Sequence, residues 1–375
     1  MKPWKLFYDL SILDFFRKEG WDMPNRTSNY SGSSYSRVRR RRKITKTVLL
    51  CLLVAFIAFG IVAMVMIFTT PPQPPANNGQ STDTPVVTDP IETEPHVEGF
   101  EVIEVDLSQL NRGDLVLVSG EHEYKALDDY ELLEIYYNRK KYDGGARAYQ
   151  LSGIDLKLAD FVLRELNAMN EAFYEESGLG GLLIKSAYRT RQEQKELYDA
   201  RVAKDGVAKA EKYVAKPGHS EHETGLAFDM SVYVDGENTY ISDEPEYRPI
   251  YSMAYKYGFI LRYPAHKVAI TGINYESWHF RYVGMPHAYY MTENDLCLEE
   301  YIDLLRRQYK YSDVHLKIDA PDRDGKVRNY EVYFVPADTS KGKNEVIVPV
   351  GYQYEISGNN VDGYIVTVDL NSQKK

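Results

Sequence analysis

The sequence predicts an α+β fold in which helices flank a central, mainly antiparallel sheet. Segments that alternate apolar and polar residues lie between segments with helical spacing, and an uncharged apolar run lies near the N-terminus. Short strand-like segments separated by Gly-containing turns follow residue 312. We therefore divide the chain into a basic tail (1–46), a single transmembrane helix (47–70), a linker (71–99), a globular domain (100–311) and a small β-rich region (312–375).

The apolar run covers residues 48–68 and contains no charged side chain. As a helix its 21 residues would extend for roughly 30 Å, which is the thickness of the hydrocarbon layer of a bilayer. Lys and Arg crowd its N-terminal flank, whereas the next Lys or Arg after it is Arg112. The positive-inside rule then predicts a single-pass cell-membrane protein with a cytoplasmic N-terminus and an extracytoplasmic globular domain. A cleaved signal peptide is the alternative, but its apolar core has only about 7–15 residues.

Charge is distributed unevenly along the chain. The net charge is −10, but residues 1–46 carry +8 and the remainder carries −18. Since nucleic-acid-binding proteins present a basic surface, we expect no nucleic acid as a partner. The basic tail suits the anionic surface of a bilayer, and the Pro, Thr, Asn and acidic residues of 71–99 are typical of a solvated tether. The sequence identifies no protein partner.

Cysteine chemistry is limited. Cys51 lies in the apolar run, and Cys297 is the other cysteine of the chain. The globular part therefore cannot form an intrachain disulfide, and a metal site made of several cysteines is excluded.

Periodicity predicts the elements of the globular domain in chain order. Residues 100–107 form an opening strand, 155–173 carry apolar side chains at helical spacing, and 182–184 form a short buried strand. Thr190 and Glu193 stand in register for a capping box, which begins a helix that reaches about Lys204.

The later elements follow from the same patterns. Residues 226–234 alternate as a strand, 247–257 form a helix that ends at Gly258, and 278–283 alternate again. We expect strands of the C-terminal β-rich region at 315–318, 330–335, 345–348 and 364–369. The sequence does not decide whether this region is a separate module or a flap on the main domain.

Two segments, 217–229 and 270–282, contain residues suited to chemistry. Asp229 lies within an alternating strand, and a carboxylate taken out of water needs a partner. A salt bridge or backbone hydrogen bonds would satisfy it, and His222 and His279 could likewise be ordinary hydrogen-bonded residues. Two His and one carboxylate are also a standard ligand set for catalytic zinc. Spacing alone leaves both interpretations open, because the metal-binding signature His-Glu-x-x-His is absent from these segments.

Here the sequence resembles a known family. Ser220-x-His222-x-x-Gly225-x-Ala227-x-Asp229, followed by Glu276-x-Trp278-His279, is similar to the VanY-type D-alanyl-D-alanine carboxypeptidases, which are zinc peptidases related to the VanX dipeptidases and to the hedgehog-type fold. The stretches 186–194 and 257–264 are also similar to that family. The resemblance covers about residues 150–290 in matching order and leaves out the tail, the apolar run, the linker and the C-terminal region.

The resemblance implies roles for named residues. It implies that His222, Asp229 and His279 hold one Zn²⁺ per chain in a cleft. Glu276 would act as general base and acid, and Arg189 would bind the substrate carboxylate or stabilise the oxyanion. Gln194 and Ser220 are further candidates for substrate binding, as groups that hold the peptide end.

The expected activity is D,D-carboxypeptidase hydrolysis of the terminal D-Ala-D-Ala bond in peptidoglycan stem peptides. An L,D-carboxypeptidase acting on tetrapeptide stems is the alternative, since related sequences do both with the same ligands. A cell-wall-binding or sensor module without catalysis is an alternative of another class. Glu276 argues against that module, because metal binding alone does not need it.

Overall fold

The computed structural model describes residues 99–125, 130–139 and 148–373. The chain divides into the units Met1–Asp89 and Pro90–Lys375, and every described residue belongs to the second. The predicted tail, transmembrane helix and linker lie outside the described residues, apart from Gly99. Within the described ranges, no helix is both long and apolar enough to cross a membrane.

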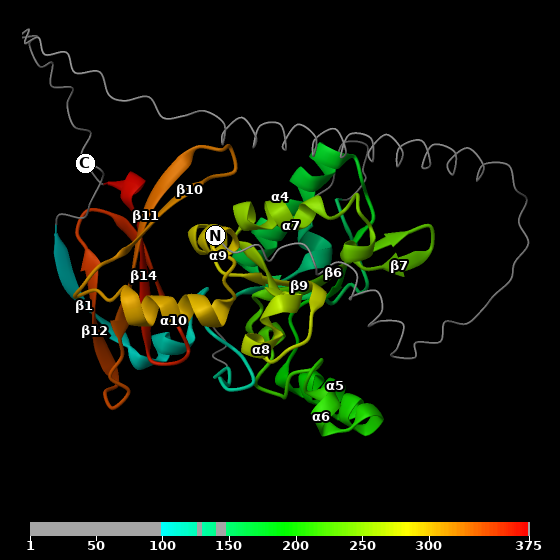
Figure 1. Cartoon of the computed structure of the whole chain (residues 1–375), viewed down its shortest axis with the longest axis horizontal. Helices are drawn as coiled ribbons and strands as arrows, with labels where there is room; N and C mark the ends of the chain where they lie inside the picture. The colour runs from blue at the N-terminus through cyan, green and yellow to red at the C-terminus, as the bar shows by residue number, and fades with distance from the viewer. Residues whose placement is uncertain (1–98, 126–129, 140–147, 374–375) are drawn as a thin grey trace, which may run out of the picture. The chain divides into compact units, whose positions relative to one another are not determined.

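A six-stranded sheet forms the centre of the part of the chain that precedes the C-terminal region (Figure 1). Neighbouring strands in this sheet are antiparallel except for one parallel pair, β3 with β5. The expected mainly antiparallel sheet is therefore present. The strand order is β3 (Gln150–Leu151), β5 (Leu182–Ser186), β6 (Ala227–Val234), β9 (Glu276–Tyr282) and β8 (Phe259–Tyr263), with β7 (Glu237–Thr239) paired to β6.

Helix α4 (Asp160–Ser177) packs its apolar stripe into the core of this sheet. The stripe includes Leu166 and Phe173, and the same core contains the stacked rings of Phe228 and Phe280. Periodicity placed the start of this helix at residue 155. The structure begins it later, because Lys157–Ala159 pair as strand β4 with β2 (Leu132–Glu134).

The capping box and the stop at Gly258 are where the sequence predicts them. The capping box is present: Thr190 Oγ1 accepts from the Glu193 backbone, and Glu193 Oε2 accepts from the Thr190 backbone. It begins helix α5 (Arg191–Asp205) directly after Arg189. The helix expected over 247–257 is split into α7 (Pro249–Met253) and the 3₁₀ helix η5 (Ala254–Tyr257), and it ends at Gly258, which has a φ of 79°.

The remaining helices are short or lie near the C-terminal region. Their bounds are α3 (Ile135–Asn138), α6 (Val207–Ala210), α8 (Val268–Thr271), α9 (Met285–Glu293) and α10 (Leu298–Gln308). The 3₁₀ helices are η1 (Leu107–Asn111), η3 (Glu221–Thr224), η4 (Ile241–Asp243), η6 (Ala265–Lys267) and η7 (Leu370–Ser372).

The C-terminal region contains an antiparallel four-stranded sheet and a two-stranded ribbon. The sheet order is β10 (Leu316–Pro321), β11 (Val327–Pro336), β14 (Gly363–Asp369) and β13 (Gln353–Gly358). Strand β13 was not predicted from the sequence. The ribbon pairs β1 (Phe100–Asp106) with β12 (Lys343–Pro349), from Phe100 opposite Pro349 to Asp106 opposite Lys343.

The pairing of β1 differs from the division made on the sequence, which placed residues 100–107 in the domain spanning 100–311. Alternation showed that β1 is a strand, but it carries no information about which strand is its partner. Ile103 and Val105 pack on a buried cluster that includes Val346 and Val348, so β1 shares its core with the C-terminal region.

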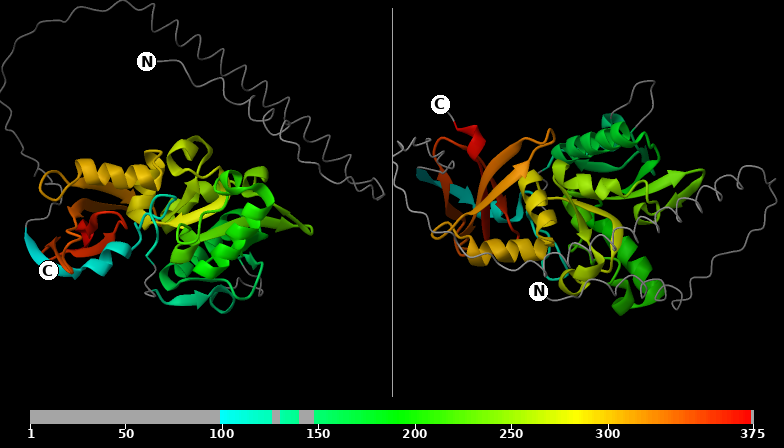
Figure 2. Two further views of the ribbon diagram at one scale, coloured as in Figure 1. Left: turned by 90° about the horizontal axis from the view of Figure 1, so that it is seen from below. Right: turned by 45° about the horizontal axis from the view of Figure 1, so that its top comes forward.

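Two cores lie on the faces of the C-terminal sheet. The apolar face of α10, with Leu298, Ile302 and Leu305, packs with Val332 on one side. The β1–β12 ribbon packs with Val366 on the other. In both views of Figure 2 the ribbon and the C-terminal sheet lie together, with α10 alongside.

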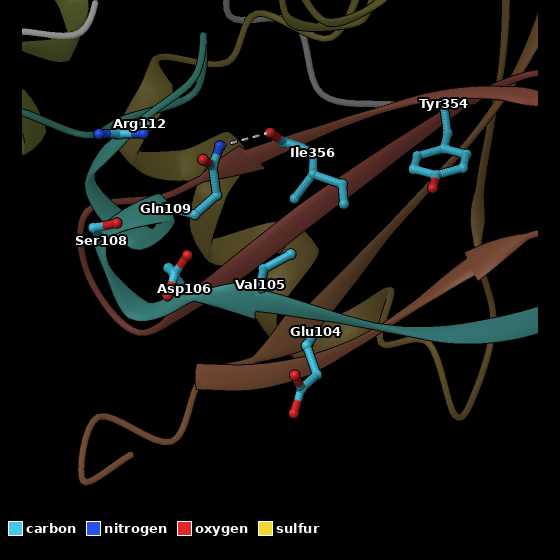
Figure 3. Close-up of a pocket in the computed structure, with 8 residues that line it drawn as sticks. All are labelled: Glu104, Val105, Asp106, Ser108, Gln109, Arg112, Tyr354 and Ile356. Carbon is cyan, nitrogen blue, oxygen red and sulfur yellow. Dashed lines mark hydrogen bonds between the residues drawn. The ribbon is translucent and has the colours of Figure 1, made fainter. Parts of the chain in front are cut away.

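The 3₁₀ helix η1 closes one end of this assembly. Gln109 Nε2 donates to the carbonyl of Ile356 in β13 at 3.3 Å, as Figure 3 shows. A pocket lies there between β1, η1 and β13. It is lined by Glu104, Val105, Asp106, Ser108, Gln109, Arg112, Tyr354 and Ile356.

A protein that begins at Leu107 should be less stable than one that begins at Gly99. Without β1, the buried cluster beneath the ribbon is exposed and β12 loses its partner. We expect a loss of about 2–5 kcal/mol in the free energy of unfolding, measured by urea denaturation. Equal midpoints for the two proteins would show that β1 is not part of the folded core.

Candidate metal centre and active site

Three side chains from separate segments meet at the central sheet, and two of them lie on its interior strands. His222 lies in η3, Asp229 in β6 and His279 in β9. Strands β6 and β9 are antiparallel, and their register places Asp229 directly opposite His279. One potential ligand atom from each of the three residues lies within 4.8 Å of the others. The structure therefore brings together the residues named as ligands.

The two imidazoles face one carboxylate oxygen. His222 Nε2 lies 3.3 Å from Asp229 Oδ1, and His279 Nδ1 lies 3.2 Å from the same atom. The imidazole rings are nearly perpendicular, with centroids 4.9 Å apart. The two histidines are buried, whereas the Asp229 side chain remains 19% exposed, so solvent reaches one side of the cluster.

Hydrogen bonds on the far side of each ring decide which nitrogen is available. His222 Nδ1 lies 2.7 Å from the carbonyl oxygen of Ala187, which can only accept, so Nδ1 carries the proton and Nε2 offers a lone pair. His279 Nε2 lies 3.2 Å from the carboxylate of Glu221, so Nδ1 faces the cluster in the same way. This is the arrangement that outer carbonyls and carboxylates give to metal-ligating imidazoles.

The cluster attracts positive charge. Asp229 Oδ1 is buried without a hydrogen-bond donor among the described residues. Burial would raise the pKa of Asp229, but His222 and His279 hold it well below its usual range. Burial would lower the pKa of His279, yet Asp229 and Glu221 raise it to about 9. With this pKa, His279 carries a second proton at neutral pH. A divalent cation that displaces this proton would satisfy the carboxylate of Asp229, so the donor set fits a zinc ion.

Glu276 lies beside the cluster at the start of β9. Its Oε2 atom is 3.6 Å from His279 Nδ1, and its side chain is buried. Burial and the nearby Asp229 raise the pKa of Glu276, whereas His279 and Arg189 lower it. The raising effects are larger, and the pKa is about 8. A carboxyl group with such a pKa can hold and release a proton near neutral pH, as a general acid–base requires.

Arg189 approaches the cluster from the end of β5. Its backbone N–H donates to the carbonyl of His222 at 3.0 Å. Burial lowers the pKa of its guanidinium, against the attraction of Asp229 and Glu276. Its buried Nε has no hydrogen-bond partner among the residues described. The guanidinium therefore lies close to the carboxylates with donor capacity for an anionic ligand.

Gln194 and Ser220 have positions in the scaffold of the site. Gln194 is buried on α5 and donates from Nε2 to the carbonyl of Ala215 at 2.7 Å, which fixes the chain before Pro217. Ser220 is buried directly before η3, and its carbonyl accepts from the Glu223 backbone. Their roles in substrate binding stay predictions.

Glu221 is a residue whose importance the sequence did not reveal. Its side chain is fully buried, and Oε2 contacts His279. Oε1 accepts from Arg262 Nε at 2.7 Å and from Arg281 Nη1 at 2.8 Å. Burial would raise the pKa of Glu221, but the two guanidinium groups hold it below its usual range. The available sequence signal for the importance of Glu221 was its place between Ser220 and His222. Its partners lie far away in sequence, so the contacts themselves could not be predicted.

One aromatic ring contacts the cluster, and two rings that neighbour His279 in the sequence pack elsewhere. Tyr263 packs against His279 with ring centroids 4.9 Å apart. Trp278 stacks on Tyr240, and Phe280 stacks on Phe228 in the core. Trp278 and Phe280 therefore serve in packing.

Known proteins match this part of the chain. The family model described as VanY, D-alanyl-D-alanine carboxypeptidase, matches residues 155–285. A D-alanyl-D-alanine carboxypeptidase of Enterococcus faecium is 34% identical over 262 residues, which cover 69% of this chain and 76% of the relative. The bifunctional D-Ala-D-Ala dipeptidase and carboxypeptidase VanXYC of Enterococcus gallinarum is 43% identical over 32% of this chain and 66% of its own length.

A solved structure also matches. The vancomycin resistance D,D-dipeptidase VanXYg, in complex with a phosphinate analogue of D-Ala-D-Ala, is 29% identical with a TM-score of 0.61. The match covers 72% of this chain and 99% of that chain. Similarity of fold therefore extends beyond the stretch matched by the family model.

Replacing Glu221 with Gln should weaken metal binding. The variant removes the negative charge that orients His279, and losses of roughly 10–100-fold in metal affinity are typical for such outer partners. Competition with a chromophoric chelator measures the dissociation constant for Zn²⁺. Glu299→Gln is the matched control, because Glu299 binds the opposite side of Arg262 and does not touch His279. Equal affinities for the two variants would contradict the role given to Glu221.

Proposed function

Because this chain belongs to the VanY family of D-alanyl-D-alanine carboxypeptidases, we propose that it is a zinc-dependent enzyme that removes the terminal D-alanine from peptidoglycan stem peptides. The observation that carries the proposal is the convergence of three potential ligand atoms beside a buried carboxyl group, within the stretch that matches the family. A cell-wall-binding module would not need Glu276 in that place.

We assign the ligand atoms to His222 Nε2, Asp229 Oδ1 and His279 Nδ1, with one ion per chain. Two imidazoles and a carboxylate would supply the three protein ligands that catalytic zinc uses. When bound, zinc would supply a Lewis acid that polarises the scissile carbonyl and lowers the pKa of water to about 7.

Glu276 moves the proton in the proposed reaction. Its carboxylate accepts a proton from the attacking water, and the resulting carboxylic acid donates it to the nitrogen of the departing D-alanine. Attack of the water oxygen on the scissile carbonyl carbon forms a new C–O bond, and the C–N bond to the departing D-alanine then breaks. The products are a shortened stem peptide and free D-alanine. General acid–base catalysis of this kind typically contributes about 10²–10⁴-fold.

Arg189 recognises the end of the substrate in this proposal. An exopeptidase must distinguish a terminal carboxylate from an internal peptide bond, and a planar guanidinium can bind a carboxylate through two parallel hydrogen bonds. The donor capacity of Arg189 beside the cluster supports this role. Gln194 and Ser220 would support the peptide end through the neighbouring loop.

The substrate assignment predicts the product. Incubation of the purified protein with a pentapeptide stem ending in D-Ala-D-Ala should release one D-alanine, identified by mass spectrometry. A chelator should abolish the release. Glu276→Gln should lower kcat by about 10²–10⁴-fold while one zinc per chain remains bound. Release of D-alanine from the tetrapeptide stem alone would instead identify an L,D-carboxypeptidase, and full turnover by Glu276→Gln would contradict its role.

We propose further that residues 48–68 anchor the enzyme in the cell membrane, with the catalytic part outside the cell. The uncharged length of this run and the basic residues before it support that orientation. Residues 71–99 would then separate the catalytic part from the bilayer and bring it to the wall.

The anchor can be tested by fractionation. The full chain should remain with the membrane after a carbonate wash, and a protein that begins at Gly99 should be soluble and active. Protease added to cells without their wall should cut the catalytic part and spare the basic tail. Recovery of the full chain in the soluble fraction would refute the anchor.

A further inference from the structure

Residues 114–124, called here the bridging segment, run between the C-terminal sheet and the candidate metal centre. They contact the β13–β14 turn on one side and the surroundings of His222 and His279 on the other. We infer that the C-terminal region positions the metal ligands through this segment, and that Asn360 is the positioning residue that fixes it. The inference rests on the proposed function only for its catalytic readout.

The C-terminal side of the bridging segment is held by several hydrogen bonds. The Leu115 backbone N–H donates to Ser357 Oγ at 2.9 Å, and the Leu117 N–H donates to the carbonyl of Asn359 at 3.1 Å. Asn360 Nδ2 donates to the carbonyls of Leu117 at 2.9 Å and Glu123 at 3.0 Å. One amide group therefore holds the segment at two points, six residues apart.

Asn360 is itself firmly placed. It is buried and has a φ of 60°, a left-handed conformation that Asn tolerates better than most residues. Its Oδ1 accepts from Asn111 Nδ2 at 2.7 Å, and its backbone N–H donates to the carbonyl of Leu110 at 2.8 Å. The preceding Asn359 accepts three backbone N–H groups of the same turn on Oδ1. The turn is thus rigid where it meets the bridging segment.

One path leads from the bridging segment to His279. Arg281 Nη2 donates to the carbonyls of Asp114 at 2.8 Å and Val116 at 2.9 Å. The same guanidinium donates from Nη1 to Glu221, whose other oxygen contacts His279. A shift of the segment would therefore move the carboxylate that orients this imidazole.

A second path leads to the loop that carries His222. The Tyr124 N–H donates to the carbonyl of Gly218 at 2.7 Å, and His219 Nδ1 donates to the carbonyl of Ser119 at 2.7 Å. Because His219 stands three residues before His222, this bond fixes the loop close to the ligand. The bridging segment thus supports both imidazoles from one side.

Arg191 strengthens the second path. It binds Glu123 and the carbonyl of Tyr124 in the bridging segment, and from Nε it binds Glu223 at 3.1 Å. Glu223 in turn accepts from the Gly218 N–H at 2.7 Å. Metal ligands need a rigid support to keep their geometry within about 0.5 Å, and these contacts provide it for a loop.

Asn360→Gly tests the inference in the full chain. Glycine adopts the same left-handed φ, so the substitution removes the amide without straining the turn. The readouts are the dissociation constant for Zn²⁺ by chelator competition, kcat and KM for the pentapeptide stem, and the thermal midpoint. We expect about a tenfold loss of zinc affinity and a lower kcat, with KM changed less.

Asn329→Ala is the matched control. Asn329 lies in β11 of the same sheet and its amide bonds Asp319 and Asn371, but none of these residues touches the bridging segment. Its zinc affinity and kcat should equal those of the natural protein. If Asn360→Gly lowers only the thermal midpoint, as a purely structural residue would, the inference is wrong.

His219→Ala decides the matter should Asn360→Gly fail to fold. This substitution removes the hydrogen bond between the His222 loop and the bridging segment, and it leaves the C-terminal sheet intact. It should lower zinc affinity similarly, and His219→Asn, which restores an N–H donor, should recover part of the loss. Unchanged affinity in His219→Ala would overturn the inference. Zinc binding answers the question even if the natural protein releases no D-alanine, an outcome that would refute the proposed function alone.

Discussion

The buried carboxylate of Glu221 organises the site. A fully buried negative charge is unfavourable unless it is paired and hydrogen-bonded, and Glu221 has two guanidinium groups and one imidazole as partners. Arg262 comes from β8 and Arg281 from β9, so the carboxylate ties η3 to two strands of the central sheet. The geometry of both imidazoles follows from this arrangement, because Glu221 contacts one ring and directly precedes the residue that carries the other.

The groups around the cluster set the protonation of its members. The imidazoles direct their inner nitrogens toward Asp229 because a carbonyl and a carboxylate lie at their outer nitrogens. Glu276 lies next to them in a setting that raises its pKa, while Asp229 lies in one that lowers its pKa. Two carboxyl groups a short distance apart thus acquire different properties, and a ligand and a proton carrier require such a difference.

Much of the site could be predicted from the sequence because its residues lie in recognisable local patterns. Alternation placed Asp229 and His279 in strands, and the Thr190–Glu193 capping box correctly fixed the start of the helix after Arg189. The roles of Glu221 and Asn360 could not be predicted, because each depends on partners far away in the chain. Strand β1 illustrates the same limit: its alternation revealed a strand, but the choice of β12 as partner depends on tertiary packing.

The pairing of β1 with β12 also determines how mechanical force would enter the protein. Any pull from the residues before Phe100 reaches the ladder between β1 and β12 first. The strands that carry Asp229 and His279 belong to a different sheet. Tension on the chain would therefore be borne by backbone hydrogen bonds in the C-terminal region, and the ligand-bearing strands would be shielded from the load.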